Sequence, residues 1–250
     1  MLDLLGYDKI QVTIERMREY EKFTHGEGFY LAFSGGKDSI VLYRLAIMAG
    51  VKFDAHMSLT SVDPPEVVRM VRSYYSDVIL EKPPKSMFQL IYDKCMLPTR
   101  ISRWCCAELK ERYGINRLVM TGIRSQESVA RKKRQMYEPC YNDPRKTFFH
   151  PLIDWTKEEI WTFITANMLF YPQLYDEGFE RVGCIGCPMS YWREWELEKY
   201  PKFYKAYLHA IEKMLTNPKR KDKTKSAQDI MDWWIKEKKM IHDDSCGLFT

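Results

Sequence analysis

The sequence has no apolar run long enough to cross a membrane, and its start, M-L-D-L-L-G-Y-D, lacks a basic stretch followed by an apolar core. We therefore expect a cytoplasmic protein with no membrane partner. No strong charge excess is present either, because a net charge of +5 over 250 residues allows an anionic partner without requiring one. A composition that is 45% hydrophobic and 29% charged excludes a disordered chain.

Both familiar glycine-rich phosphate motifs are also missing. The candidate loop is F-S-G-G-K-D-S, residues 33–39, which follows a short apolar stretch. A Walker A loop would need a glycine where Leu31 stands and a serine or threonine where Asp38 stands. The dinucleotide fingerprint fails because the two glycines are adjacent. The loop therefore needs another explanation.

The apolar pattern predicts strands that alternate with helices up to about residue 155. The expected strands are 29–33, 51–59, 78–80 and 117–122. The expected helices are 8–23, 39–48 with Gly50 as its cap, one beginning near 63–66, 86–95, and one that follows the cysteine pair at 105–106 and ends at Gly114. Such alternation implies a parallel sheet, in which ligands bind beyond the carboxyl ends of the strands.

After about residue 156 the pattern changes to helices rich in Trp and Tyr. These helices are expected at 157–168, 192–215 and 227–239. We therefore predict an α/β nucleotide domain over residues 1–155 and a helical region over 156–250, packed together as one unit. No internal repeat is visible.

The candidate loop lies between a strand and a helix, a geometry that aims free backbone N–H groups at an anion. The residues expected to bind a nucleotide there are Ser34, Gly35, Gly36, Lys37, Asp38 and Ser39. Glycines allow close approach to phosphate, the serines can donate hydrogen bonds, and Lys37 supplies charge. Asp38 makes sense if Mg²⁺ bridges it to phosphates, or if it caps the helix. The plain alternative is a glycine turn with a surface lysine.

A second polar segment follows the fourth expected strand. Its candidate nucleotide-binding residues are Thr121, Gly122, Arg124, Glu127 and Ser128. Arg124 can contact phosphate or sulfate oxygens with its planar guanidinium, and we also expect it, with Lys37 and Asp38, to be catalytic. The basic run 131–134 that follows is either a solvated helix face or a further phosphate contact.

Four of the seven cysteines form two close pairs. They are Cys105 and Cys106, which are adjacent, and Cys184 and Cys187, which form a C-x-x-C with Gly183 and Gly186 beside them. Without an export signal, clustered cysteines indicate a metal or redox site rather than disulfides. Ordinary buried thiols, a structural Zn²⁺ with four cysteines and a [4Fe–4S] cluster are the alternatives, and the cluster fits the pattern best.

These motifs together resemble known families. The S-G-G-K-D-S string resembles the PP-loop of the adenine nucleotide alpha-hydrolase superfamily. The G-I-R-S-Q-E-S and P-L-I-D-W-T strings are similar to motifs of the PAPS reductase family. The C-C … C-x-x-C arrangement resembles that of adenylyl-sulfate reductases and DNA-phosphorothioation ATP pyrophosphatases. The resemblance implies a Rossmann-like (HUP-type) five-stranded parallel sheet flanked by helices, an adenine nucleotide, and sulfur chemistry.

Two activities are compatible with this resemblance. An intact loop favours an ATP pyrophosphatase that uses Mg²⁺, carries the [4Fe–4S] cluster and activates an acceptor for sulfur transfer. The alternative is thioredoxin-dependent reduction of APS or PAPS by Cys246, whose C-G-L context resembles the family's tail. Asp243 and Asp244 beside it disfavour a thiolate.

A third hypothesis is a nucleic-acid-binding module with a vestigial nucleotide site. The basic stretches 131–134 and 217–225 and the aromatic helices motivate it. The partners compatible with these hypotheses are an adenine nucleotide, thioredoxin or a cysteine-desulfurase sulfur donor, a nucleic-acid acceptor, and further copies of the chain in a homo-oligomer.

Overall fold

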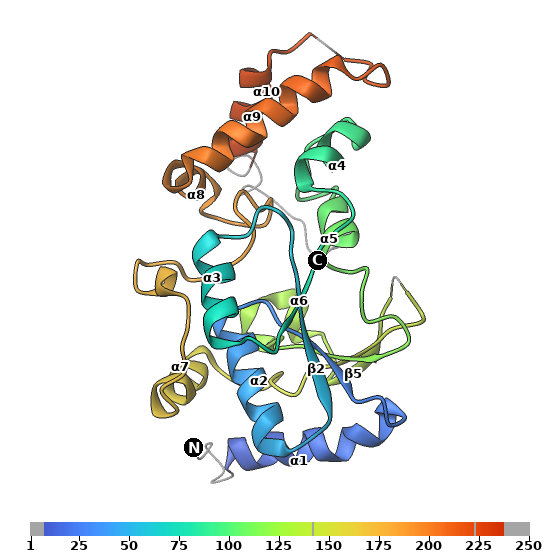
Figure 1. Cartoon of the computed structure of the whole chain (residues 1–250), viewed down its shortest axis with the longest axis vertical. Helices are drawn as coiled ribbons and strands as arrows, with labels where there is room; N and C mark the ends of the chain where they lie inside the picture. The colour runs from blue at the N-terminus through green and yellow to red at the C-terminus, as the bar shows by residue number, and fades with distance from the viewer. Residues whose placement is uncertain (1–7, 142, 223, 238–250) are drawn as a thin grey trace. The chain divides into compact units, whose positions relative to one another are not determined.

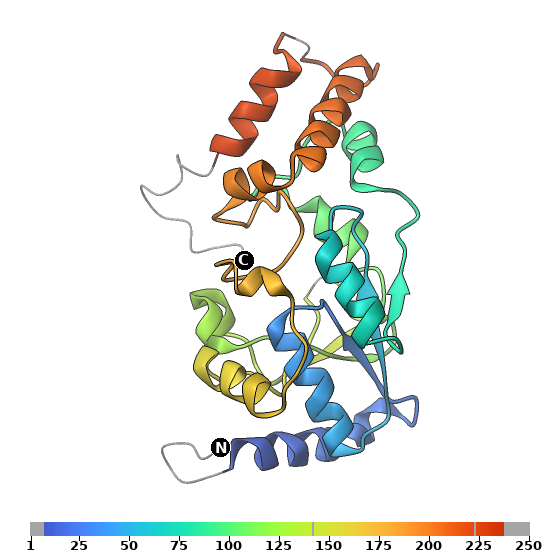
Figure 2. The same cartoon turned by 60° about the vertical axis from the view of Figure 1, so that its left-hand side comes forward.

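The chain divides into two compact units, each assembled from segments that are distant in sequence. We describe residues 8–141, 143–222 and 224–237 in a computed structural model (Figures 1 and 2). The first unit comprises Met1–Ser58, Pro65–Glu81 and Tyr113–Val182, and the second comprises Leu59–Pro64, Lys82–Arg112 and Gly183–Thr250. Because compactness alone defines these units, the expected functional division between residues 155 and 156 stays a prediction.

A six-stranded sheet forms the centre of the first unit. Its strands are β1 (Phe29–Ala32), β2 (Phe53–Ser58), β3 (Ile79–Glu81), β4 (Leu118–Met120), β5 (Tyr137–Pro139) and β6 (Thr147–Phe149). Their order is β3-β2-β1-β4-β6-β5, and all neighbours are parallel except β5 and β6, which are antiparallel. The expected five-stranded parallel sheet is confirmed, and the structure adds one antiparallel edge strand.

The central strand β1 is buried because its sequence is apolar on both faces. Phe29 and Leu31 are fully buried, and Leu31 lies in register with Ala55 of β2 and Met120 of β4. A continuous apolar run of this kind is typical of a parallel strand covered on both sides. Strand order reverses between β1 and β4, so their carboxyl ends form the switch point where parallel α/β sheets bind ligands.

Helices surround this sheet in the first unit. They are α1 (Lys9–Tyr20), α2 (Lys37–Ala49), α3 (Pro65–Tyr74), α6 (Val129–Lys132) and α7 (Lys157–Ala166), with short 3₁₀ helices η1 (Glu21–Thr24), η2 (Ser125–Glu127) and η3 (Gln173–Tyr175). α2 packs its buried apolar face, including Ile40 and Leu42, toward the core. Gly50 ends this helix in the left-handed conformation, at φ +68°, so the predicted cap is confirmed.

The second unit is helical in its described part. Its helices are α4 (Met87–Lys94), α5 (Trp104–Leu109), α8 (Arg193–Lys199), α9 (Pro201–Thr216) and α10 (Ala227–Lys236). Figures 1 and 2 show α9 and α10 side by side, and the rings of Tyr207 and Trp234 between them lie 4.9 Å apart. None of the described helices of the chain combines the length and the apolar character that a bilayer span requires.

The largest differences from the expected helices lie in the second unit. The single helix expected over 192–215 is wrong, because α8 ends at Lys199 and α9 begins at Pro201. Tyr200 takes φ −116° and ψ 68°, since a residue before proline is disfavoured in the helical region, whereas proline suits the first helical position. The helix expected to reach Gly114 ends earlier, at Leu109.

Candidate nucleotide-binding site and cysteine cluster

The loop Ser34–Ser39 joins β1 to α2 and is held in shape by its own serines. The Ser39 hydroxyl donates to the Gly36 carbonyl at 2.8 Å and accepts from the Ser34 N–H at 3.2 Å. The Ser34 hydroxyl in turn accepts from the Gly36 N–H at 3.3 Å. Both hydroxyls thus bond within the loop, and their contact with a phosphate stays a prediction.

The two glycines of the loop serve different purposes. Gly35 has φ +72°, and a Cβ there would lie only 2.7 Å from Val67 Cγ1 of α3, so no larger residue fits without strain. Gly36 is the N-cap of α2 and offers no side chain to the first turn of the helix. The positive end of α2 is therefore not capped by a side chain of the loop, as an anion-binding helix terminus requires.

Two buried cations meet at a carboxylate beside the loop. Lys37 and Arg124 are 6% and 3% exposed. Asp38 Oδ1 accepts a hydrogen bond from Arg124 Nε at 2.6 Å, and Asp38 Oδ2 lies 3.2 Å from Lys37 Nζ. Asp38 lies in the first turn of α2, and its role beside a nucleotide stays a prediction. Its carboxylate pairs the two cations, which leaves the group with one net positive charge for an anion.

The segment after β4 reaches the loop because Gly122 has no side chain. A Cβ at Gly122 would lie 3.0 Å from the Asp38 backbone carbonyl. Arg124 is then fixed by a second contact, from its Nη1 to Gln126 Oε1 at 3.1 Å. The same Gln126 oxygen accepts the Lys157 N–H at the start of α7, at 2.6 Å. This chain of bonds orients the Arg124 guanidinium toward Asp38.

The remaining residues predicted from this segment bond locally. Glu127 accepts the Arg124 N–H at 2.9 Å, and Ser128 caps α6 with its hydroxyl. Thr121 Oγ1 lies 2.7 Å from His150 Nδ1. The structure therefore brings Gly122 and Arg124 to the loop, whereas Glu127, Ser128 and Thr121 have partners of their own, and their contact with a nucleotide stays a prediction.

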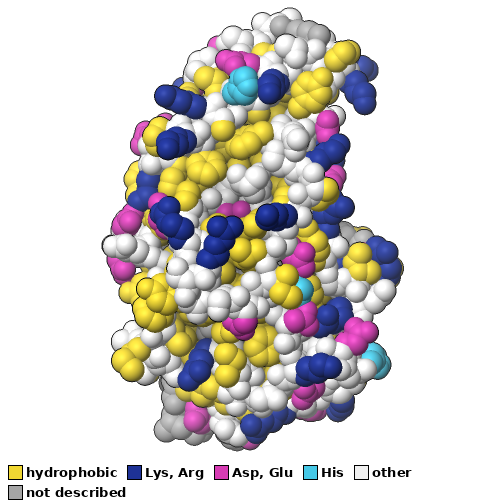
Figure 3. Space-filling view, in the orientation of Figure 1, with side chains coloured by type: hydrophobic (Ala, Val, Ile, Leu, Met, Phe, Trp, Pro, Cys, Tyr) yellow, Lys and Arg dark blue, Asp and Glu magenta, His cyan; other side chains and the backbone are white. Residues whose placement is uncertain are grey.

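The basic run 131–134 is partly neutralised by neighbouring acids. Arg131 pairs with Glu127, and Arg134 pairs with Glu138. On the face drawn in Figure 3, Lys and Arg side chains lie scattered among Asp and Glu. Local ion pairing therefore accounts for two of the four basic residues.

His150 is a fully buried histidine that directly follows β6. Its Nδ1 faces Thr121 and its Nε2 lies 3.5 Å from Glu138 Oε1. Burial, helped by the charge of Arg134 and opposed by that of Glu138, lowers the pKa of His150 to about 4. The imidazole is therefore neutral at pH 7, and its two ring nitrogens bridge Thr121 and Glu138.

This histidine should make the folded chain sensitive to acid. Between its ordinary pKa of about 6.5 and the folded value near 4, the unfolded chain binds a proton that the folded chain does not, so stability falls as pH falls. We expect a loss of roughly 1.5 kcal/mol between pH 6.5 and 5 from this group alone. Urea unfolding of the wild type and His150→Asn at both pH values measures it, and equal pH slopes for the two proteins would contradict it.

One residue at the loop carried no signal in the sequence. The hydroxyl of Tyr175, in η3, accepts a hydrogen bond from the Lys37 backbone N–H at 3.1 Å. Its ring also lies under the Lys37 ammonium, 5.4 Å from Nζ to the ring centroid. No glycine or charge marks this position, and only the folded chain brings it to the loop.

All four cysteines predicted as ligands belong to the second unit. Cys105 and Cys106 lie on α5, and Cys184 and Cys187 lie in the loop before α8. The Cys187 N–H donates to the Cys184 carbonyl at 3.2 Å and closes a tight turn. Gly186 makes this turn possible, since its φ is +72° and a Cβ would lie 3.0 Å from the Trp234 ring.

A buried arginine donates hydrogen bonds to the backbone of the C-x-x-C turn. Arg193 is 1% exposed and donates to the Pro188 carbonyl at 2.8 Å, to the Cys187 carbonyl at 3.4 Å and to the Trp234 carbonyl. The Cys184 thiol donates to Thr60 Oγ1 at 3.4 Å, which ties the turn to a segment much earlier in the sequence. The turn is therefore anchored on both sides.

Cations accompany the cysteines. A hydrogen bond from Cys105, with help from Lys110 and Arg103, lowers the pKa of Cys106 to about 5, while the same hydrogen bond and burial raise the pKa of Cys105. Arg103 Nη2 lies 3.6 Å from Cys106 Sγ. The charge of Cys184 is the main cause that raises the pKa of Lys110. Positive charge of this kind stabilises thiolates, the form that binds metals.

The donor set fits an iron–sulfur cluster in its chemistry. Cys106, Cys187 and Cys184 all act electrostatically on Cys105, so the four thiols share one neighbourhood. In the described part of the chain, no three His, Cys, Asp or Glu side chains are arranged to hold a single metal ion. A [4Fe–4S] cluster makes a different demand, because its four thiolates surround a cluster instead of one ion.

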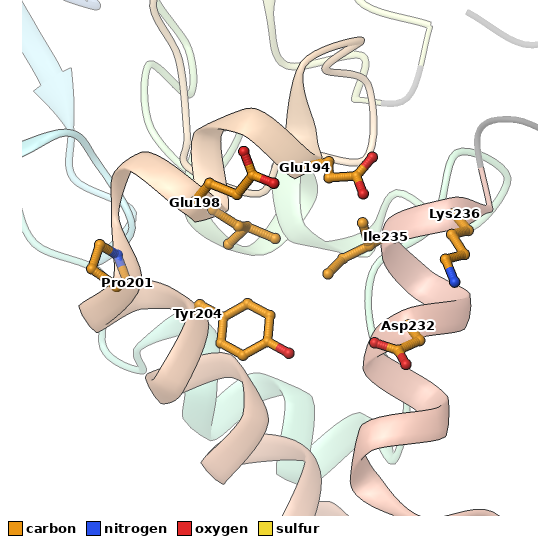
Figure 4. A pocket seen from close by; sticks show the side chains of 8 residues that line it. Glu194, Glu198, Pro201, Tyr204, Asp232, Ile235 and Lys236 are labelled. Carbon is orange, nitrogen blue, oxygen red and sulfur yellow. The ribbon is translucent and has the colours of Figure 1, made fainter.

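The second unit also contains a pocket of about 300 Å³ between its helices (Figure 4). It is lined by residues of α8, α9 and α10, namely Glu194, Leu197, Glu198, Pro201, Tyr204, Asp232, Ile235 and Lys236. None of the predicted site residues lines it. Cys246 lies outside the described residues, and its predicted catalytic role stays a prediction.

Comparison with known proteins agrees with this architecture. The family model described as the phosphoadenosine phosphosulfate reductase domain matches residues 28–190. An adenosine 5′-phosphosulfate reductase of Shouchella clausii is 23% identical over 209 residues, which are 74% of this chain and 83% of that protein. The crystal structure of a phosphoadenylyl-sulfate (PAPS) reductase from Candida auris has a TM-score of 0.53 at 16% identity and covers 74% of this chain and 96% of that one.

The fold defines an α/β protein whose strand–loop–helix segment Ser34–Ser39 lies at the switch point of its sheet, the place where parallel α/β sheets bind ligands. Because the family model covers most of the chain, the chain belongs to the PAPS reductase domain family. An uncharacterized protein of Methanocaldococcus jannaschii is 27% identical over 194 residues, which are 73% of this chain and 47% of that protein. This chain thus spans about half the length of that relative.

Proposed function

We propose that this chain binds ATP at the loop Ser34–Ser39 and cleaves it between the α- and β-phosphates. The observation that carries the proposal is the meeting of the α2 N-terminus, whose N-cap Gly36 has no side chain, with two buried cations, Lys37 and Arg124, at the carboxyl ends of β1 and β4. One ammonium, one guanidinium and a row of amides suit a polyphosphate better than a single sulfate. The proposed products are AMP, attached to an acceptor or free, and pyrophosphate.

In this reaction an acceptor oxygen attacks the α-phosphorus, the bridging P–O bond to the β-phosphate breaks, and its electron pair leaves with pyrophosphate. Lys37 and Arg124 would offset the charge that develops on the leaving group. Asp38, which pairs both cations, would release them as phosphate oxygens take its place. Mg²⁺ would enter with ATP and supply further charge neutralisation, and Asp38 is the loop carboxylate suited to bind it.

We propose that Cys105, Cys106, Cys184 and Cys187 hold a [4Fe–4S] cluster, which would supply electron transfer or a sulfur-binding surface. Arg103 and Lys110 support this proposal, because they hold positive charge beside thiols that must ionise to become ligands. The acceptor for sulfur chemistry would be a small molecule or a nucleic acid, with the sulfur supplied by a cysteine desulfurase.

A sulfonucleotide reductase is the second candidate, favoured by the relatives named as adenosine 5′-phosphosulfate reductases. In that reaction the Cys246 thiolate would attack the sulfur of APS or PAPS and displace the nucleotide. Thioredoxin would then release sulfite and become oxidised. The same loop would hold the nucleotide phosphate.

One experiment separates the two activities. Protein purified and reconstituted without oxygen is supplied with ATP and Mg²⁺, or with APS or PAPS and reduced thioredoxin, while pyrophosphate and sulfite are quantified. We expect pyrophosphate from ATP. Sulfite formation that Cys246→Ser abolishes would establish the reductase instead.

A further inference from the structure

Tyr175 lies beside the loop at the first residue of α2. Its hydroxyl accepts from the Lys37 N–H, the first amide of α2, at 3.1 Å. A Cβ on the preceding Gly36 would lie 3.3 Å from the same hydroxyl oxygen. The amides at the start of a helix are the groups that bind anions, so this hydroxyl stands directly before an anion-binding amide.

The hydroxyl is arranged to donate its proton. Burial raises the pKa of Tyr175, so the phenol stays neutral at pH 7. Its oxygen accepts the Lys37 N–H and is also hydrogen-bonded by the Val182 backbone. Because a phenol has two lone pairs and one proton, two acceptor contacts leave the O–H as the remaining group. In the described part of the chain this proton has no acceptor.

The ring of Tyr175 is held in place independently of its hydroxyl. Trp161 of α7 packs edge-on against it with ring centroids 5.1 Å apart, and Tyr171 lies 6.4 Å away. The Lys37 ammonium lies on the ring. Removing the hydroxyl alone therefore leaves the packing and the lysine contact intact.

We propose that Tyr175 is a substrate-binding residue that donates its hydroxyl proton to the pyrophosphoryl part of the bound nucleotide, an inference that rests on the proposed ATP site. The Lys37 amide donates to the phenol oxygen and polarises the O–H bond. The phenol O–H thereby becomes a stronger donor to an anionic oxygen. Because the phenol is neutral, it favours a ligand with a correctly placed oxygen acceptor and adds no positive charge to the site. The ligand class that this arrangement favours is a di- or triphosphate rather than a nucleoside monophosphate.

The test is the affinity of Tyr175→Phe for inorganic pyrophosphate, ATP and AMP, measured by calorimetry on the full iron-loaded chain. A hydrogen bond to a charged group contributes roughly 1.5–3 kcal/mol, so pyrophosphate and ATP should bind about tenfold to a hundredfold more weakly. AMP affinity should stay within about twofold, whereas a general distortion of the loop would weaken all three. Tyr171→Phe is the matched control, because its hydroxyl bonds to exposed Asp176 at 3.1 Å and should not affect any ligand.

Equal or tighter pyrophosphate binding by Tyr175→Phe would overturn the inference, because the hydroxyl would then be a placeholder that the phosphate displaces. If the wild type binds AMP and pyrophosphate and Tyr175→Phe binds both with the same affinity, the inference is refuted and the proposed function still stands. A wild type that binds neither ligand refutes both. A measurement without substitution is the tyrosine hydroxyl proton resonance, which should become protected from exchange when pyrophosphate is added and should stay unprotected if the inference is wrong.

Discussion

Replacement of Lys37 by alanine is expected to slow pyrophosphate release from ATP by about a hundredfold to a thousandfold. Losing one preorganised charged donor at a developing anion typically costs about 3 kcal/mol of transition-state stabilisation. Lys37 is well placed for this effect, because its side chain is buried and its ammonium is held between Asp38 and the Tyr175 ring. The measurement is single-turnover pyrophosphate release at saturating ATP.

Lys205→Ala is the matched control for this prediction. Lys205 is an exposed lysine on α9 in the second unit, so its loss removes the same charge far from the loop in sequence. Its rate should equal that of the wild type. Less than a tenfold loss in Lys37→Ala, with thermal unfolding unchanged, would show that this ammonium does not stabilise the leaving group.

Substitution of Cys184 by serine is expected to remove the iron. Wild-type protein purified without oxygen should contain roughly four iron atoms per chain with matching acid-labile sulfide, as a four-cysteine cluster requires. In Cys184→Ser both should fall to a small fraction, because serine lacks the sulfur that a four-cysteine cluster needs as its ligand. Metal analysis and the visible absorption spectrum measure the loss.

Cys95→Ser and Cys140→Ser provide the controls. Both are free cysteines in the described part of the chain and belong to neither close pair, so their iron content should match the wild type. About one zinc per chain without iron or sulfide would point to a structural zinc site. Absence of any bound metal after anaerobic reconstitution would show that the four cysteines are ordinary thiols.

Most of the sheet was predictable because parallel strands carry a local signal. β1 is a short apolar run next to a glycine-rich loop, and each such run between helices suggests a crossover. β5 and β6 were both missed, since each is only three residues long, and Tyr137–Pro139 is also largely exposed and contains a proline. The strand conformation of both segments depends on tertiary pairing, between β5 and β6 and between β6 and β4. The division between α8 and α9 was missed although Pro201 marks it.

The positions of the loop and of the cysteine pairs follow from the sequence alone. Glycine conformation, strand propensity and residue spacing act between neighbours along the chain, so the printed order of residues is sufficient. The tertiary structure alone decided that Asp38 pairs with Arg124 and that the Tyr175 hydroxyl meets the Lys37 amide. These partners are 86 and 138 residues apart, and their contact exists only after the chain has folded back on itself.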